Sequence, residues 1–236
     1  MGMDGIEALT NHTLAELNAI FEFNSHTNLA YQVFEDKAPN NLVTVTMATN
    51  ILNTKQDLLP LYLKYRNGYL LTLSFQHTVT LFEAFFFDLL RLLLIEEPSH
   101  IAVNKKIDVE IALSAPDRAS LISIIIDREL NELKYAKVVD WFIFLNKVLR
   151  RASITQEEVL RIVEIKATRD IIVHNSDIVN KIYITKTGNM ARYSEGEAID
   201  IPPIYFNSTC YRSRHSMENA SRKQTTLSTK PCGVTA

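Results

Sequence analysis

The strongest pattern in the sequence is a helical repeat of apolar residues between residues 61 and 95. One face of this predicted helix carries apolar side chains at spacings of four, three and four: Phe82, Phe86, Leu89 and Leu93. Further apolar residues of the same stretch point to its other sides. A helix that is apolar on most sides is buried, so this one is expected at the centre of a bundle or in a dimer contact.

Other segments repeat the helical period. Residues 4–23 predict an amphipathic helix, and residues 155–174 predict another, which begins with Thr155 followed three residues later by Glu158. That pair is typical of a capping box, in which each side chain bonds the backbone of the other residue. The β-branched segment 39–52 is compatible with either a strand or a helix. With only 6 Gly and 7 Pro in 236 residues, the chain is predicted to be all-α, an up-and-down helical bundle.

The same pattern divides the chain into three parts. Residues 1–60 are predicted as an N-terminal helical extension, and residues 61–206 as the main helical domain. Within that domain, two short β-prone pieces, 191–194 and 198–206, are expected to pair as a small β-ribbon near the C-terminus. Residues 207–236 are polar and lack an apolar period, which predicts a disordered tail.

Composition and charge limit the classes of function that the chain can have. A net charge of -2 gives no global positive field for nucleic acid, although a local basic groove is compatible with it. Cys210 and Cys232 have no Cys or His neighbours at zinc spacing, so neither a disulfide framework nor a bound metal or other cofactor is expected. The most apolar run, residues 81–95, contains charged residues and is too short to cross a bilayer. We therefore expect a soluble cytoplasmic protein without a membrane partner.

The candidate chemistry lies near the end of the helix 155–174. Asp170 and His174 are four residues apart and share a face, whereas Arg169 points roughly 140° away from His174. A histidine exchanges protons near neutral pH, a neighbouring carboxylate orients it, and an arginine matches phosphate oxygens. These groups suit metal-independent cleavage of RNA, whose 2'-hydroxyl supplies the nucleophile. The ordinary alternative is a helix-end histidine that caps carbonyl groups, with an arginine in a surface ion pair.

Neighbouring polar residues have two interpretations each. Asn175 would bind the RNA backbone or simply end the helix, and Lys166, one turn before Asp170, would bind RNA or face solvent. His77 and Glu83 on the long early helix would line the same cleft or belong to the plain surface. Among these residues, Asn175 and Lys166 are the predicted RNA contacts.

The segment "RDIIVHNSDIVNKIY", residues 169–183, resembles the signature of HEPN (higher eukaryotes and prokaryotes nucleotide-binding) domains. In that signature an arginine, a polar residue, three variable positions and a histidine precede an asparagine and a short apolar helix. The segment "LLTLSFQHTVTLFEAFFFDLLRLLL", residues 70–94, is similar to the long early helix of the family. The resemblance covers roughly residues 65–200.

This resemblance implies a HEPN-type bundle that forms a homodimer, so that the motifs of two chains face each other across a cleft. Many such domains are endoribonucleases of toxin–antitoxin pairs, antiviral (phage) defence or RNA processing, which implies RNA and an antitoxin or other protein as partners. Arg169 would stabilise the phosphorane, His174 would be general base or acid, and Asp170 would orient the site. The products would be a 2',3'-cyclic phosphate and a 5'-hydroxyl. The alternative is a non-catalytic HEPN module that binds RNA, a nucleotide or a protein.

Two departures from the family pattern are visible in the sequence. Asp170 stands where asparagine is frequent, which adds negative charge close to a phosphate. Family members also close the bundle with another helix after the small ribbon, whereas residues 207–236 are predicted to be disordered. Either the N-terminal extension completes the bundle or the end of the chain is atypical.

Overall fold

A computed structural model describes residues 2–37, 39–45, 50–101, 112, 115–150 and 154–228. The described chain is mostly helical, which confirms the all-α prediction. Its elements in chain order are α1 (Gly2–Lys37), β1 (Asn41–Val45), β2 (Asn50–Thr54), α2 (Lys55–Lys64), the π-helical turn η1 (Tyr65–Tyr69), α3 (Leu70–Glu96), the 3-10 turn η2 (Pro98–His100), α5 (Arg118–Lys134), α6 (Val138–Leu149), α7 (Gln156–His174), α8 (Lys181–Thr187), the 3-10 turn η3 (Gly188–Met190) and α9 (Pro203–Ser228).

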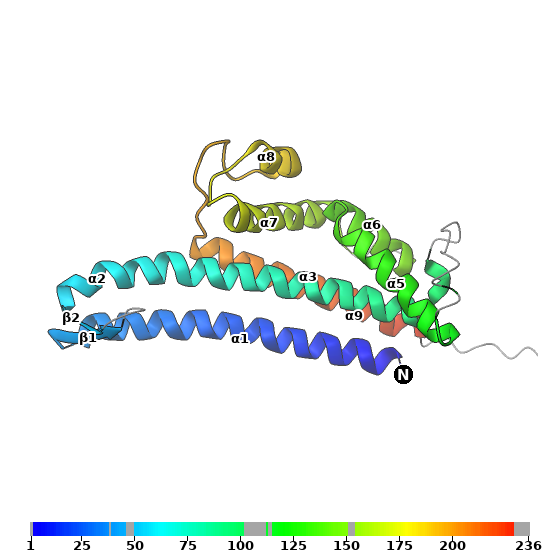
Figure 1. Ribbon diagram of the computed structural model, residues 1–236, viewed down its shortest axis with the longest axis horizontal. Coiled ribbons are helices and arrows are strands. Elements are labelled where there is room, and N and C mark those ends of the chain that lie inside the picture. The colour runs from blue at the N-terminus through cyan, green and yellow to red at the C-terminus, as the bar shows by residue number, and fades with distance from the viewer. Residues whose placement is uncertain are drawn as a thin grey trace, which may run out of the picture.

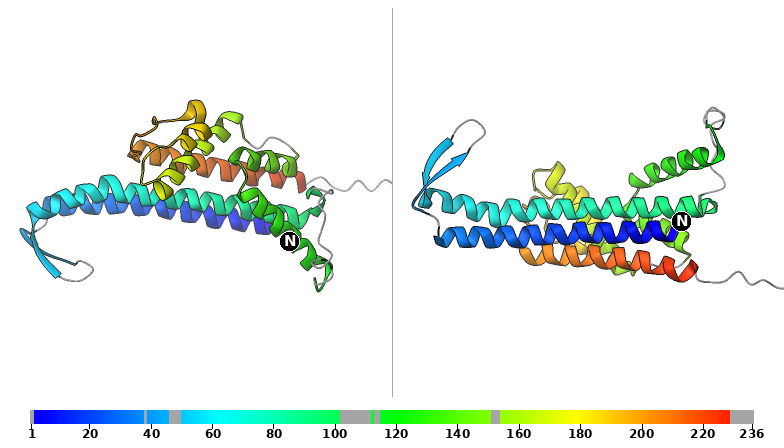
Figure 2. Two further views of the ribbon diagram at one scale, coloured as in Figure 1. Left: turned by 45° about the horizontal axis from the view of Figure 1, so that its top comes forward. Right: turned by 90° about the horizontal axis from the view of Figure 1, so that it is seen from below.

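Three long helices form the scaffold of the molecule. α1 runs antiparallel to the continuous rod of α2, η1 and α3, and α9 packs against both α1 and α3 (Figures 1 and 2). α5, α6 and α7 pack against α3, and α8 lies on the outer side of α7 (Figure 1). The segment predicted as an N-terminal extension therefore packs along the main helical domain. None of the described helices has a stretch both long and apolar enough to cross a bilayer.

The buried apolar side chains of the described residues form two clusters. The first joins α1, α3, α5, α6, α7 and α9 around Phe86. The ring of Phe86 contacts those of Phe87, Trp141 and Phe142 at centroid distances between 5.2 and 5.7 Å. The predicted apolar face of the long early helix lies in this cluster, with Leu89 entirely buried. The second cluster joins α1, α3, α7, α8 and α9. Because α7 belongs to both clusters, its position is fixed along its whole length.

The start of α7 follows the prediction from the sequence. The Glu158 amide donates to Thr155 Oγ1 at 3.2 Å, and the Thr155 amide donates to Glu158 Oε2 at 2.7 Å, which completes the capping box. The helix ends at His174, and Asn175 is its C-cap. Ser176 and Asp177 then adopt φ angles of 51° and 64°, in the left-handed region. This turn directs the chain into α8.

The prediction of a disordered tail is wrong for residues 207–228, which belong to α9. This helix buries residues at spacings of four, seven and three, namely Phe206, Cys210, Met217 and Ala220. Buried small hydroxyl residues lie between these apolar positions. Thr209 Oγ1 donates to the Tyr205 carbonyl at 2.9 Å, so this buried hydroxyl has a hydrogen-bond partner within the helix. α9 thus closes the bundle. Residues 229–236, including Cys232, lie outside the described chain.

The predicted pairing of 191–194 with 198–206 is also not formed. Instead, Ile178 forms an antiparallel bridge with Ala198, and the Ile199 amide donates to the Asp177 carbonyl at 2.7 Å. The segment that begins at residue 198 therefore pairs with the turn after α7, and not with residues 191–194. The segment 39–52, open to both interpretations, contributes to a two-stranded antiparallel hairpin of β1 and β2.

If α9 is part of the core, Met217→Ala will lower the free energy of unfolding by about 2–5 kcal/mol, because a fully buried side chain leaves a cavity. Tyr211→Ala, at an exposed position of the same helix, serves as the control and is expected to change stability by less than about 1 kcal/mol. Urea denaturation followed by far-UV circular dichroism measures both. Equal stabilities of the two variants would contradict the packing of α9.

Candidate active site

An open groove lies between the C-terminal half of α7 and α8. Its volume is about 400 Å³, and its polar lining consists of Asp170, His174, Asn175, Asn180 and Lys186, together with the buried Tyr183. His174 is exposed at the last position of α7, and no hydrogen bond or ion pair in the described part of the chain restrains its ring. The groove therefore places a free imidazole beside a carboxylate, two amides and an ammonium group.

Asp170 is the electrostatic centre of this region. Its Oδ1 lies 3.4 Å from Arg169 Nη1 and 3.5 Å from Lys166 Nζ, and its Oδ2 lies 3.4 Å from Lys186 Nζ. The predicted direct contact between Asp170 and His174 is not made, although both side chains line the groove. Asp170 holds cations from α7 and α8 together.

Arg169 lies beside the groove and is not part of its lining. Its side chain is 23% exposed and forms the contact with Asp170, while its Nε is buried without a hydrogen-bond partner. A buried donor without a partner is unfavourable, since water no longer satisfies it. Within one protomer, the structure does not bring the guanidinium of Arg169 and the imidazole of His174 together.

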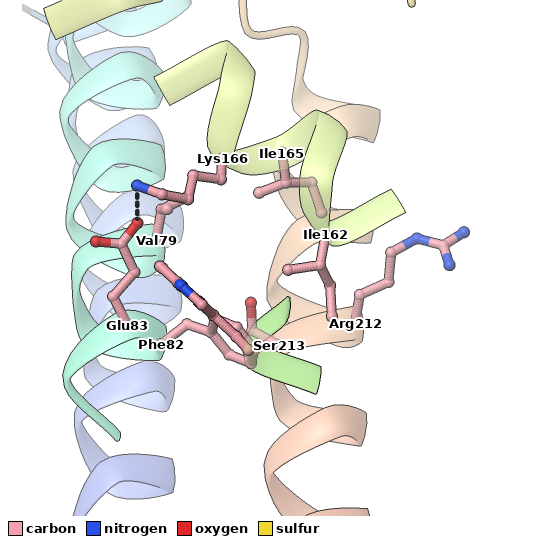
Figure 3. A pocket seen from close by; sticks show the side chains of 9 residues that line it. Val79, Phe82, Glu83, Ile162, Ile165, Lys166, Arg212 and Ser213 are labelled. Atoms are coloured by element: carbon pink, nitrogen blue, oxygen red, sulfur yellow. Dashed lines mark hydrogen bonds and ion pairs between the residues drawn. The ribbon is translucent and has the colours of Figure 1, made fainter. Parts of the chain in front are cut away.

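Lys166 points away from the groove, toward α3. Its Nζ donates to Glu83 Oε1 at 2.7 Å, and both residues line a small, mostly apolar pocket (Figure 3). The same ammonium lies 5.6 Å from the centre of the Trp141 ring. Both Lys166, predicted to bind RNA, and Glu83, weighed as a cleft residue, are thus engaged in a contact between α7 and α3.

Asn175 closes the turn that follows α7. Its backbone amide donates to the Ile171 carbonyl at 2.9 Å, and its side-chain Nδ2 donates to the Ile178 carbonyl. The residue also lines the groove. Of the two roles considered for Asn175, ending the helix is therefore one that it performs.

Sequence reasoning missed the buried network that holds this end of the molecule together. Glu164 is 5% exposed, and its Oε1 accepts hydrogen bonds from Thr168 at 2.8 Å, Tyr183 at 3.0 Å and Arg192 Nε at 2.9 Å. Its Oε2 accepts from the Tyr205 hydroxyl at 2.8 Å. The Arg192 guanidinium also lies 3.4 Å from the centre of the Tyr205 ring. The network joins α7, α8, the loop before α9, and α9.

The burial of this network changes the pKa values of its members. Burial, together with the charge of Glu164, raises the pKa of Tyr205 well above its usual value, and the pKa of Tyr183 is raised for the same two reasons. For Arg192, burial alone would lower the pKa, but Tyr205 and Glu164 outweigh it and raise the pKa. The Tyr183 and Tyr205 hydroxyls therefore stay protonated at neutral pH and act as donors to Glu164.

No protein-family model, curated protein or solved structure matches the chain. Within the described ranges, no group of three or more His, Cys, Asp or Glu side chains is arranged to hold a metal ion.

Glu164→Ala should lower the free energy of unfolding by about 3–5 kcal/mol, because it leaves the Arg192 charge buried without its anion. Glu157→Ala, which removes an exposed ion pair with Arg161 on the same helix, is the matched control and should cost below about 1 kcal/mol. Urea titrations of both variants give the comparison. A loss of similar size in both would mean that the network contributes no more than a surface pair.

The raised pKa of Tyr205 predicts a loss of stability at alkaline pH. The unfolded chain releases the tyrosine proton near pH 10, while the folded protein retains it to higher pH. The contribution of protonated Tyr205 to the free energy of unfolding is therefore complete below about pH 10 and is lost as the pH rises further. Tyr205→Phe should lower stability at neutral pH and flatten its decline between about pH 9 and pH 11. Urea unfolding across this range measures the effect, and parallel curves for variant and wild type would contradict it.

Proposed function

We propose that the chain is a metal-independent endoribonuclease of HEPN type that cleaves single-stranded RNA in a composite site formed by two copies. The observation that carries this proposal is the exposed imidazole of His174 in an open groove with Asp170 and Lys186. The arginine of the motif lies next to Asp170. An activity of this kind suits a toxin controlled by an antitoxin, or a component of phage defence.

The proposed reaction needs a base, an acid and cations. An imidazole removes the proton of the ribose 2'-hydroxyl, whose oxygen attacks the adjacent phosphorus. The bond between phosphorus and the 5'-oxygen then breaks, and a protonated imidazole supplies a proton to that leaving oxygen. Arg169 stabilises the additional negative charge of the phosphorane. The products are a 2',3'-cyclic phosphate and a 5'-hydroxyl, so atoms and protons balance without a metal.

Two features of one protomer favour a composite site. Arg169 and His174 point to different sides of α7, and the Arg169 Nε is buried without a hydrogen-bond partner. Apolar side chains are also exposed near His174, since Val173, Ile178 and Ile182 are 43%, 41% and 62% exposed. A second copy that covers this apolar surface would bring its own motif to the groove.

A non-catalytic HEPN module is the second candidate. It is favoured by one observation: Asp170 is occupied by cations and does not orient His174. A groove of this kind would bind RNA, a nucleotide or a protein partner without cleaving RNA.

Purified protein incubated with labelled single-stranded RNA in EDTA distinguishes the candidates. We expect cleavage by the wild type and a fall in rate of about 10²–10⁴-fold in His174→Ala, because the proton transfers are lost. Arg169→Ala should also be nearly inactive. His77→Ala, at an exposed histidine of α3, is the control and should cleave normally.

Mixing the two inactive variants tests the composite site. Subunit exchange between His174→Ala and Arg169→Ala places an intact histidine and an intact arginine in the same mixed dimer, so part of the activity should return. Intact RNA in the presence of bound, folded wild-type protein would instead support the non-catalytic module. Cleavage without any restoration on mixing would contradict a site shared between copies.

A further inference from the structure

Lys186 enters the groove from α8, outside the segment that carries the motif. Its Nζ lies 3.4 Å from Asp170 Oδ2, and its side chain is 51% exposed. The short helix that carries it is fixed in place, because the Asn180 side chain caps its first turn and Tyr183 is buried. Lys186 thus faces His174 across the groove on a rigid support.

The charges around Asp170 do not cancel. Lys166 has a separate anion, Glu83, at 2.7 Å. Arg169 and Lys186 share the single carboxylate of Asp170, each at 3.4 Å, and in the described part of the chain neither forms another ion pair. The three cations and two carboxylates therefore carry one excess positive charge, and Lys186 is the cation among them that lines the groove. A second anion would be attracted there at little cost in desolvation, since Lys186 already faces solvent.

We infer that Lys186 binds a backbone phosphate of the RNA strand, next to the phosphodiester that is cleaved, and that Asp170 positions its ammonium group when RNA is absent. This inference rests on the proposed function and adds a substrate contact to the same groove. Because His174 and Lys186 line the same groove, a strand lying along it would present one phosphate to His174 and a neighbouring phosphate to Lys186. The exposed side chain of Ile182 beside Lys186 offers an apolar surface to the ribose or base between them.

The test measures binding separately from cleavage. A fluorescent 2'-O-methyl oligoribonucleotide lacks the free 2'-hydroxyl and cannot be cleaved by this route. Its affinity is followed by fluorescence anisotropy over a series of salt concentrations, with wild type, Lys186→Ala and Lys186→Arg. Each phosphate contact on a single strand contributes about -0.7 to the slope of log affinity against log salt.

Lys186→Ala is expected to weaken binding about three- to tenfold at low salt and to make the slope shallower by about 0.7. Lys186→Arg keeps the charge and should keep the slope. Lys181→Ala removes an exposed lysine of the same helix that does not line the groove, and it should bind as the wild type does. Circular dichroism and thermal melting verify that each variant is folded.

Asp170→Asn separates the positioning role from a purely structural one. With the carboxylate neutralised, Lys186 has no competing anion, and the oligonucleotide should bind about threefold more tightly than to wild type. That gain should disappear in the double variant with Lys186→Ala, because the two residues are coupled. Three results would overturn the inference. They are an unchanged salt dependence of binding in Lys186→Ala, a loss of affinity in Lys186→Ala no larger than that in Lys181→Ala, and no binding of the oligonucleotide at all.

Cleavage of ordinary RNA is scored in parallel. A shallower salt dependence of binding in Lys186→Ala, with no cleavage by the wild type, would contradict the nuclease proposal and support the phosphate contact. Cleavage that depends on His174, with an unchanged salt dependence in Lys186→Ala, would support the nuclease and contradict the phosphate contact.

Discussion

The buried carboxylate of Glu164 is the constraint on which the arrangement of the groove depends. A carboxylate that is only 5% exposed requires several hydrogen-bond donors. Thr168 provides one from the same helix, and Tyr183, Arg192 and Tyr205 provide the others from later segments of the chain. Meeting this requirement fixes α8 against α7 and anchors the start of α9. Since one wall of the groove is α7 and the other is α8, the relative position of His174 and Lys186 follows from the contacts of a residue that touches neither of them.

Local signals in the sequence predicted local structure well. The spacing of Phe82, Phe86, Leu89 and Leu93 predicted a buried face, and Thr155 with Glu158 predicted the start of α7, because both depend on residues within a few turns of each other. α9 was missed because its buried apolar residues are few and small hydroxyl residues fill the rest of its contact surface, a composition that is also typical of a disordered segment. Thr209 and Ser213 are buried because α9 packs into the bundle, where α1 and α3 are among its neighbours.

The candidate site was predictable to a similar extent. Helical geometry correctly placed Asp170 and His174 along one groove and Arg169 apart from His174, since all three lie on one helix. The partners of these residues come from elsewhere: Lys186 is 16 positions beyond Asp170, and Glu83 is 83 positions before Lys166. Such pairs depend on how α3, α7 and α8 pack, and no spacing rule in the sequence contains that information. The family membership implied by the motif remains a prediction.

The two left-handed residues after α7 bear on how the groove works. Ser176 and Asp177 both carry side chains, and each is less favourable at a positive φ than glycine would be. Backbone hydrogen bonds from the Val179 amide to the Glu197 carbonyl and from the Ile199 amide to the Asp177 carbonyl hold them in that shape. The helix end that presents His174 is consequently preformed. A ligand entering the groove would meet walls already in position, and little of its interaction energy would be consumed in ordering the protein.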